Sequence, residues 1–138
     1  MKITLSVLIP AYNVEEYLSK SVLSVLRQQD LRCDLEIIIV DNQSTDRTFR
    51  IAEELQEAYP DIVKAFQNAE NLGIAYSMNR LWENSQSEFS IILHADNELI
   101  DGGLRLFIDY VESKDYQRGI VFGDLVYIDG SNNVIGSW

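Results

Sequence analysis

Three apolar runs in this chain each end in a cluster of polar or acidic residues. The runs cover residues 5–9, 36–40 and 90–93 and are rich in isoleucine, leucine and valine. Short runs of this kind are typical of strands that are buried on both faces of a parallel sheet. The segments between the runs are long enough for a helix. This alternation predicts an α/β fold whose mainly parallel sheet carries helices on both faces.

Helices are expected where apolar residues recur at helical spacing. The first should cover residues 14–29, and the second should follow residue 46 and stop at Pro60. The third should begin at residues 71–73 and the fourth at residues 101–103. In the third helix the apolar side chains expected to face the core are Ile74, Ala75, Met78, Leu81 and Trp82.

Polar residues beside these helices fit the role of caps. Asn13 and Glu16 match a capping box for the first helix. Ser44, Thr45 or Asp46 can satisfy free N–H groups at the start of the second helix, with Ser44 and Thr45 favoured, and Asp101 can do so for the fourth.

Strands are also expected outside the three apolar runs. Residues 62–66 predict a strand between the second and third helices. Near the end of the chain, residues 119–128 are rich in β-forming side chains, residues 129–133 predict a turn, and residues 134–135 predict a return strand. The chain should therefore carry a C-terminal β-hairpin.

Size and composition predict one domain that spans residues 1–138. The features below favour the cytoplasm as its location. Hydrophobic residues make up 46% of the chain, which is enough for a real core. No apolar stretch approaches the length of a membrane span, and residues 1–4 lack the features of a signal peptide. The single cysteine, Cys33, cannot form an internal disulfide, so nothing requires an oxidising compartment. Peripheral attachment at the inner face of the membrane is compatible with these features.

The chain is strongly acidic, with a net charge of −11. We expect no binding to nucleic acid, because such binding depends on cationic contacts to phosphate. An anionic ligand would need a local cation, and a divalent metal ion is the simplest supply. The alternative interpretation is that the charge forms a solvated surface that keeps the protein soluble.

The polar clusters after the apolar runs should lie along one edge of the sheet, because ligands of open α/β sheets sit beyond the carboxyl ends of the strands. Asn13, Asp41 and Asp96 are expected there. Tyr12 offers a ring that can stack on a nucleobase. Asp41 can accept hydrogen bonds from a ribose hydroxyl or a base N–H, and it lies too early to be a helix cap. The alternatives are that Tyr12 packs on the rim and that Asn13 only caps a helix.

The cluster after the third run suits a divalent cation. Carboxylate and amide oxygens at a strand end suit Mg²⁺ or Mn²⁺, which are held by one or two carboxylates together with phosphates. His94 alternates with Asp96, so both can point to the same side. We interpret His94 equally well as a metal ligand or as a hydrogen-bonded rim residue. Glu98 is more typical of a solvated charge.

Four segments, in their order and spacing, resemble the nucleotide-binding half of the family-2 glycosyltransferases, which have the GT-A fold with a Rossmann-like sheet. The segments are residues 6–13, residues 36–48, residues 71–73 with Asn79, and residues 93–97. The resemblance implies a donor sugar carried by UDP, GDP or dTDP and a divalent metal, Mn²⁺ or Mg²⁺. It also implies inverting transfer of a hexosyl-type sugar to a saccharide or lipid-linked acceptor, in polysaccharide or glycoconjugate biosynthesis.

The resemblance further implies which residues hold the donor. Tyr12, Asp41 and Asn42 would face the base and the ribose. The nucleotide-binding set that it implies is Pro10, Tyr12, Asn13, Asp41, Asn42, Asn71, Gly73 and Asn79. The catalytic base and the acceptor pocket would come from sequence beyond Trp138. We therefore expect this chain to be the donor-binding portion of a longer enzyme, or a lone donor-binding half, and to be inactive in isolation.

Asp96 matches the acid of the family's DxD-type metal motif, with His94 and Asn97 as further metal candidates. The family commonly carries aspartates where His94 and Asn97 stand, a second acid where Asn42 stands, and a basic residue where Met78 stands. These departures motivate an alternative function, that of a nucleotide-sugar-binding module without catalysis.

Two other functions are weaker alternatives. A dinucleotide-dependent oxidoreductase needs a glycine-rich turn after its first strand, and residues 10–13 contain no glycine. A structural role, with the hairpin forming the edge of an oligomer, is compatible with the sequence because exposed strand edges invite pairing.

Overall fold

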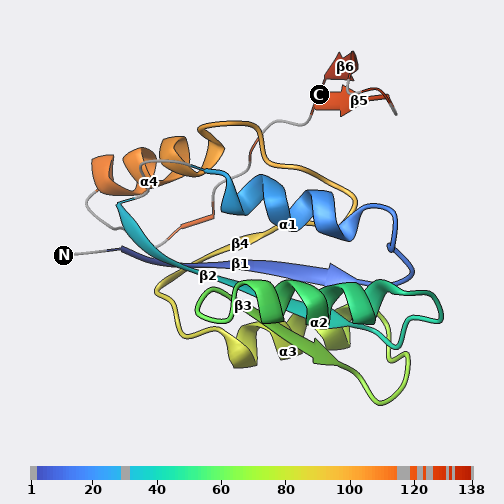
Figure 1. Cartoon of the computed structure of the whole chain (residues 1–138). Coiled ribbons are helices and arrows are strands. Elements are labelled where there is room, and N and C mark those ends of the chain that lie inside the picture. Colours follow the sequence, from blue (N-terminus) through green and yellow to red (C-terminus); the bar gives the residue numbers. More distant parts are fainter. Residues whose placement is uncertain are drawn as a thin grey trace.

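A computed structural model of the chain describes residues 3–28, 32–114, 119–120, 123, 126–129, 131 and 133–137 (Figure 1). The elements follow one another in the order β1 (Ile3–Ala11), α1 (Leu18–Leu26), β2 (Cys33–Asp41), α2 (Thr48–Ala58), β3 (Val63–Gln67), α3 (Ile74–Asn84), β4 (Phe89–Ile92), α4 (Gly103–Ser113), β5 (Val126–Ile128) and β6 (Val134–Ser137). This alternation confirms the predicted α/β class.

The main sheet has the strand order β3-β2-β1-β4, and all its pairs are parallel. The chain places β2 and then β3 on one side of β1, and it returns to place β4 on the other side. The strand order therefore reverses at β1, between β2 and β4. In open α/β sheets this reversal opens a crevice in which ligands bind.

Helices cover both faces of the sheet, as the sequence predicts. On one face, α1, α2 and α4 pack against side chains such as Val7 and Ile39. On the other face, Leu81 of α3 packs against Leu8 and Ile38 (Figure 1). Consecutive residues in the middle of β1 and β2 are buried on opposite faces, which explains why residues 7–9 and 37–40 are all apolar. Across the described ranges, every helix is too short or too polar to cross a membrane.

The first helix is shorter than the predicted residues 14–29, because α1 begins only after a turn. Its N-cap is Tyr17, which makes no side-chain capping bond, and the Tyr17 N–H donates to Val14 O at 3.0 Å. The predicted capping box of Asn13 and Glu16 is therefore wrong. The Asn13 side chain is bonded to the loop after β2 instead.

Asp46, rather than Ser44 or Thr45, serves the start of α2. The Thr48 N–H donates to Asp46 Oδ1 at 2.9 Å. Burial is the largest influence on the pKa of Asp46 and raises it, but hydrogen bonds from Thr48 and from the Glu15 N–H outweigh burial and lower that pKa below its ordinary value. Of the three candidates Asp46 is confirmed, and the preference for Ser44 and Thr45 is wrong, because Ser44 is bonded to Asp41 and Thr45 to Asn13.

The predicted cap of α4 is wrong as well. The N-cap is Gly102, whose φ of 78° lies in the left-handed region that favours glycine. The Asp101 side chain is 91% exposed and lies 3.7 Å from Arg27 Nε.

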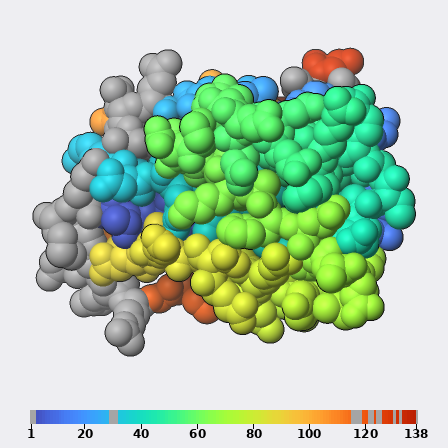
Figure 2. Space-filling view, turned by 60° about the horizontal axis from the view of Figure 1, so that its bottom comes forward, coloured from blue at the N-terminus to red at the C-terminus, as the bar shows by residue number. Residues whose placement is uncertain are grey.

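The orientation of α3 differs in part from the prediction. Leu81 is fully buried and Met78 is partly buried, as expected. Ile74 and Trp82 are 58% and 49% exposed, and Ala75 is exposed, so the inward orientation predicted for these three is wrong. Figure 2 shows the yellow and yellow-green atoms of α3 at the surface. Among the described elements α3 alone covers this face, so no neighbouring helix buries its flanks.

The predicted hairpin is present where the structure describes it. β5 and β6 pair antiparallel, and the Asp129 carboxylate accepts the Ser131 and Asn133 N–H groups in the turn between them. Of the predicted strand over residues 119–128, the structure shows Val126–Ile128 as strand, and residues 121–122 and 124–125 lie outside the described residues.

Glu36 of β2 joins the sheet to the loop between α3 and β4. Its Oε1 accepts the Ser6 hydroxyl at 2.6 Å and the Gln86 N–H at 2.9 Å, and Lys64 Nζ donates to Oε2 at 2.9 Å. Burial is the largest influence on the pKa of Glu36 and opposes ionisation. The hydrogen bonds from Ser6, Gln86 and Lys64 and the Lys64 charge outweigh it and lower this pKa to about 2.

Candidate functional site

The loops that follow β1 and β2 are joined to each other by hydrogen bonds. Asn13 has a left-handed φ of 51°, which asparagine tolerates better than most residues, and its Oδ1 accepts the Thr45 N–H at 2.9 Å. The Asn13 N–H donates to Ser44 Oγ at 2.9 Å. The Arg47 N–H donates to Glu15 Oε2 at 2.9 Å. The two loops therefore form one ordered unit at the carboxyl ends of the central strands.

Asp41, the last residue of β2, is fully buried, and its carboxylate is bonded within the protein. Its Oδ2 accepts the Ser44 N–H and Gln67 Nε2, each at 3.0 Å, and its Oδ1 accepts the Ser44 hydroxyl. A ligand would have to displace one of these donors to reach the carboxylate. This geometry favours a role in holding the ends of β2 and β3 together.

Asn42 is buried and belongs to a chain of side-chain amides. Its Oδ1 accepts Asn68 Nδ2 at 2.9 Å and the Leu72 N–H at 3.2 Å. Its Nδ2 donates to Asn71 Oδ1 at 2.7 Å, and the same oxygen accepts the Gly73 N–H at 3.1 Å. These bonds connect the end of β2 to the loop between β3 and α3.

Asn68 extends this network to α3. Its Nδ2 donates to Ser77 Oγ at 3.0 Å, and its Oδ1 accepts Arg80 NH1 at 2.7 Å. Arg80 also donates to Gln67 O, and its guanidinium lies 5.7 Å from the centroid of the Phe66 ring. Asn68 and Ser77 are each 1% exposed, so every polar group in this interior needs such a partner.

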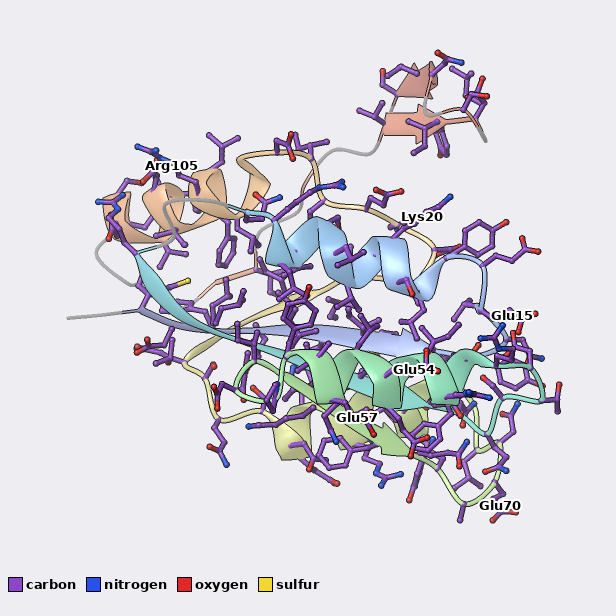
Figure 3. The ribbon with its side chains drawn as sticks, in the orientation of Figure 1. Glu15, Lys20, Glu54, Glu57, Glu70 and Arg105 are labelled. Atoms are coloured by element: carbon purple, nitrogen blue, oxygen red, sulfur yellow. The ribbon has the colours of Figure 1, made fainter. Side chains whose placement is uncertain are left out.

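A pocket of about 250 Å³ opens where these loops meet the start of α3. It is lined by Pro10, Ala11, Tyr12, Asn42, Asn71, Gly73, Ile74 and Ser77. Tyr12 is 46% exposed and forms one wall, while the amide network forms another. Glu15 and Glu70 mark this end of the molecule in Figure 3, near the arrowheads of β1 and β3.

The pocket brings together five of the predicted nucleotide-binding residues, which are Pro10, Tyr12, Asn42, Asn71 and Gly73. Three others do not line it. Asn13 and Asp41 support the surrounding loops, and Asn79 lies exposed on α3.

Sequence reasoning missed Ser77 and Asn68. Ser77 lies one helical turn after Gly73, so its spacing is a signal that it shares the face of α3 that meets the pocket. Asn68 follows β3 as directly as Asn42 follows Asp41, and this position at a strand end is the signal that could have identified it.

The acidic loop after β4 lies next to the end of β1 in the sheet order. His94 and Asp96 are exposed and alternate with the buried Leu93 and Ala95. Within the described ranges, no group of three histidine, cysteine, aspartate or glutamate side chains is close enough to hold a metal ion.

Hydrogen bonds from the end of α1 hold this loop in place. The Leu99 N–H donates to Ser24 Oγ at 2.9 Å, and Gln28 Nε2 donates to Ile100 O at 3.0 Å. Arg27 NH2 pairs with Glu98 Oε2 at 3.1 Å. Glu98 is thus an ion-pair partner rather than the free solvated charge that the sequence suggested.

A second hollow, of about 230 Å³, is lined by Tyr17, Lys20, Asp96, Asn97, Glu98, Ile128 and Asp129. Lys20 supplies a cation from α1 beside the acidic loop (Figure 3). Sequence reasoning did not select it, because a single lysine on the exposed side of a helix carries no distinguishing signal.

Comparison with known families accounts for this arrangement. The family model "Glycosyl transferase family 2" matches residues 6–136. This chain belongs to glycosyltransferase family 2. The resemblance predicted from the four segments is thereby confirmed, and with it the placement among transferases.

Two relatives are bacterial proteins that are named as glycosyltransferases. The chain is 33% identical over 131 residues to the uncharacterized glycosyltransferase alr2836 of Nostoc sp., covering 95% of this chain and 39% of that protein. It is 40% identical over 91 residues to the uncharacterized glycosyltransferase YfnE of Bacillus subtilis, covering 66% of this chain and 22% of that protein. The chain therefore spans less than half the length of either relative.

Solved structures of glycosyltransferases share the fold. S. aureus TarS 1–349 in complex with UDP-GlcNAc matches with a TM-score of 0.71 and 24% identity, over 80% of this chain and 32% of that chain. The mannosyltransferase PcManGT from Pyrobaculum calidifontis, in complex with GDP-Man and Mn²⁺, matches with a TM-score of 0.73 and 23% identity, over 80% of this chain and 33% of PcManGT. The predicted GT-A fold is confirmed.

Proposed function

We propose that residues 1–138 form the donor-binding unit of a glycosyltransferase that moves a sugar from a nucleoside diphosphate to an acceptor hydroxyl. The observation that carries this proposal is the pocket at the carboxyl ends of β1 and β2, beside the loop that presents Asp96 at the end of β4. The names of two structural neighbours, which report complexes with UDP-GlcNAc and GDP-Man, support a donor of this class.

In this proposal the pocket holds the nucleoside. The ring of Tyr12 offers a stacking surface, and Asn42, Asn71 and Ser77 supply polar groups along the opposite wall. Asn13 and Asp41 act indirectly, since they fix the loops that shape the pocket. The diphosphate would extend from the pocket toward Asp96.

The residues after β4 fit a divalent metal that is bound together with its substrate. Asp96 offers an exposed carboxylate and Asn97 an exposed amide, and hard cations such as Mg²⁺ and Mn²⁺ accept a few protein oxygens when phosphates complete the set. His94 is a further candidate ligand. A bound metal would offset the charge that develops on the departing diphosphate. The Mn²⁺ named in the PcManGT complex supports this assignment.

Glycosyl transfer by a single displacement would invert the configuration at the anomeric carbon of the donor sugar. An acceptor hydroxyl, on a saccharide or a lipid-linked saccharide, would attack in line with the departing nucleotide. This chain would position the donor, and the alignment of two substrates can supply a large part of the reduction in the activation free energy.

A calorimetric titration tests the proposal. UDP, GDP and dTDP are each added to the chain with and without Mn²⁺. We expect saturable binding of at least one nucleotide that strengthens with Mn²⁺, and a ligand at a hundred times its Kd should stabilise the fold by about 2.7 kcal/mol. Folded protein that binds none of the three would overturn the proposal.

Asp96 is tested by a matched pair of variants. Asp96→Asn should abolish the gain from Mn²⁺, while Asp101→Asn, which removes another exposed aspartate from the same loop, should keep it. A non-catalytic sugar-nucleotide-binding module is the second candidate, favoured by the small donor set around Asp96. Full-length protein that binds donor but gives no transfer to any acceptor would support this second candidate.

A further inference from the structure

The loop that carries Asp96 joins β4 to α4 and is anchored on both sides of that residue (Figure 1). Before Asp96, the Leu93 N–H donates to Leu8 O in β1 at 3.0 Å. After Asp96, the Leu99 N–H donates to Ser24 Oγ in α1 at 2.9 Å. Asp96 itself is exposed between the two anchors. The position of its carboxylate therefore depends on both of these hydrogen bonds.

Ser24 can act only as an acceptor toward this loop. It is fully buried, and its hydroxyl donates to Ser21 O, in the preceding turn of the same helix, at 2.6 Å. Because that bond uses its single proton, its oxygen is left to accept, and a backbone N–H such as that of Leu99 can only donate. Without the Ser24 hydroxyl, the part-buried Leu99 N–H would lose this partner, which favours a shift of the loop toward water.

Gln28, just after α1, makes the opposite type of contact. Its Nε2 donates to Ser24 O and to Ile100 O, each at 3.0 Å. Both partners are carbonyl oxygens, so the amide must keep its NH₂ group toward them. It does so although its Oε1 is buried without a partner among the described residues. Ile100 O also accepts the Gly103 N–H at 3.0 Å, so the Gln28 bond holds the loop where α4 begins.

The ion pairs in the same region lie at the surface and are expected to matter less. Arg27 lies 3.1 Å from Glu98 and 3.7 Å from Asp101, and its side chain is 53% exposed. Pairs of this kind contribute little, because water screens them. The other hydrogen bonds that join residues 94–102 to the end of α1, within the described part of the chain, are those of Ser24 and Gln28.

We propose that Ser24 and Gln28 are positioning residues that hold Asp96 where a divalent metal and the donor diphosphate meet. This inference rests on the proposed function. Neither residue lines either hollow, so both act through the loop. A carboxylate that is already held in place loses little freedom when it binds a cation. Removal of the groups that orient a metal ligand typically weakens metal binding by about 10–100-fold.

The test compares two serines of one helix. Ser21 and Ser24 are 1% and 0% exposed, but the Ser21 hydroxyl has no hydrogen-bond partner among the described residues. Mn²⁺ is titrated by calorimetry into each variant after saturation with whichever of UDP, GDP and dTDP the wild-type chain binds most tightly. Ser24→Ala should raise the Kd for Mn²⁺ about tenfold or more and leave the Kd for the nucleotide without metal unchanged. Ser21→Ala should change neither.

Amide hydrogen exchange reports on the loop independently of any ligand. The Leu99 N–H should exchange faster in Ser24→Ala than in the wild-type chain or in Ser21→Ala, because only Ser24→Ala removes its acceptor.

A pair of glutamine variants repeats the comparison. Gln28→Met removes both donors to the carbonyls and should also raise the Kd for Mn²⁺. Gln56→Met is the control, because Gln56 Oε1 accepts the Ala65 N–H at 2.8 Å in β3, at the edge of the sheet opposite β4. It should leave the Kd for Mn²⁺ unchanged.

Each outcome decides the inference. An unchanged Kd for Mn²⁺ in Ser24→Ala and Gln28→Met would overturn it and leave the proposed nucleotide site standing. An equal loss of affinity for Mn²⁺ and for the nucleotide without metal would show a general structural role and would also overturn it. If Ser24→Ala does not fold, Gln28→Met decides. A wild-type chain that binds nucleotide but no Mn²⁺ would overturn this inference together with the metal site, and a chain that binds no nucleotide would overturn the proposed function as well.

Discussion

The Oδ1 of Asn13 lies 2.9 Å from the backbone nitrogen of Thr45 and ties the loop after β1 to the loop after β2. The residues are separated by a whole strand and helix in sequence, yet a single side chain joins them. Asn13 also adopts a left-handed φ of 51°. Substitutions can therefore separate the contribution of its side-chain hydrogen bond to the free energy of unfolding from that of its backbone conformation.

Asn13→Gly should keep the backbone conformation and lose the hydrogen bond, which costs about 0.5–1.5 kcal/mol of unfolding free energy. Asn13→Ala should cost a further 1 kcal/mol or so, because alanine is strained at positive φ. Urea denaturation measures both. Gln43→Gly is the control, since Gln43 also has a positive φ of 61° and glycine there should be neutral or slightly stabilising. Equal stability of Asn13→Gly and wild type would show that the bond contributes nothing.

Tyr12 should contribute to nucleotide affinity by stacking. Tyr12→Ala is expected to weaken binding of the preferred nucleotide by about 1–3 kcal/mol, measured by calorimetry. Tyr110→Ala on α4 is the matched control, because both rings are 46% exposed and Tyr110 lies outside the pocket. A similar loss in both variants, or none in Tyr12→Ala, would contradict a stacking role.

Glu36 should make stability depend on pH in the acid range. Its pKa is lowered from 4.5 to about 2 in the folded protein, so the folded state favours the ionised form. The contribution, on the order of 3 kcal/mol, is fully present above pH 4.5 and is lost as the pH falls toward 2. Urea denaturation at a series of pH values from about 6 to about 2 should show this loss of unfolding free energy.

Glu36→Gln should flatten that part of the pH dependence and lower stability at neutral pH by about 1–3 kcal/mol. Glu54→Gln is the control, because Glu54 is half-exposed in an i,i+4 pair with Arg50 and should change stability by about 0.5 kcal/mol or less. An unchanged acid-range profile in Glu36→Gln would show that other carboxylates carry the effect.

The orientation of α3 can be tested with two neighbouring residues. Leu81→Ala should cost about 2–5 kcal/mol, because Leu81 is fully buried against β1 and β2. Trp82→Ala should cost under about 1 kcal/mol, because Trp82 is half-exposed. A loss in Trp82→Ala comparable to that in Leu81→Ala, in thermal or urea denaturation, would restore the inward orientation that helical spacing predicts for Trp82.

The strands could be predicted from sequence because a strand that is buried on both faces requires several consecutive apolar residues, which are visible locally. Runs such as residues 37–40 are apolar throughout, and a strand buried on both faces explains them better than any other element does. Helix orientation was harder to predict. Ile74 and Trp82 fit an apolar stripe, but burial depends on whether a neighbour covers that side, and the spacing of residues within one helix does not record this.

The candidate site shows the same division. Tyr12 and Asn42 could be placed at the sheet edge, because parallel strands end together, whereas Asn71 was selected through the family resemblance. The functions of Asn13 and Asp41 could not be foreseen, since both depend on loop residues that approach only after folding. The same holds for helix caps. Asn13 matches a capping box in sequence, but its side chain accepts the Thr45 N–H, which is distant along the chain.

The bonds between the first two loops also bear on the thermodynamics of recognition. In the proposed function, a nucleotide that binds at Tyr12 would meet loops that are already ordered, so little of the binding free energy would be spent on immobilising the backbone. Affinity differences among nucleotides should then reflect the functional groups of the nucleotides themselves. Small chemical changes in the base should change the dissociation rate by nearly the same factor as they change the affinity.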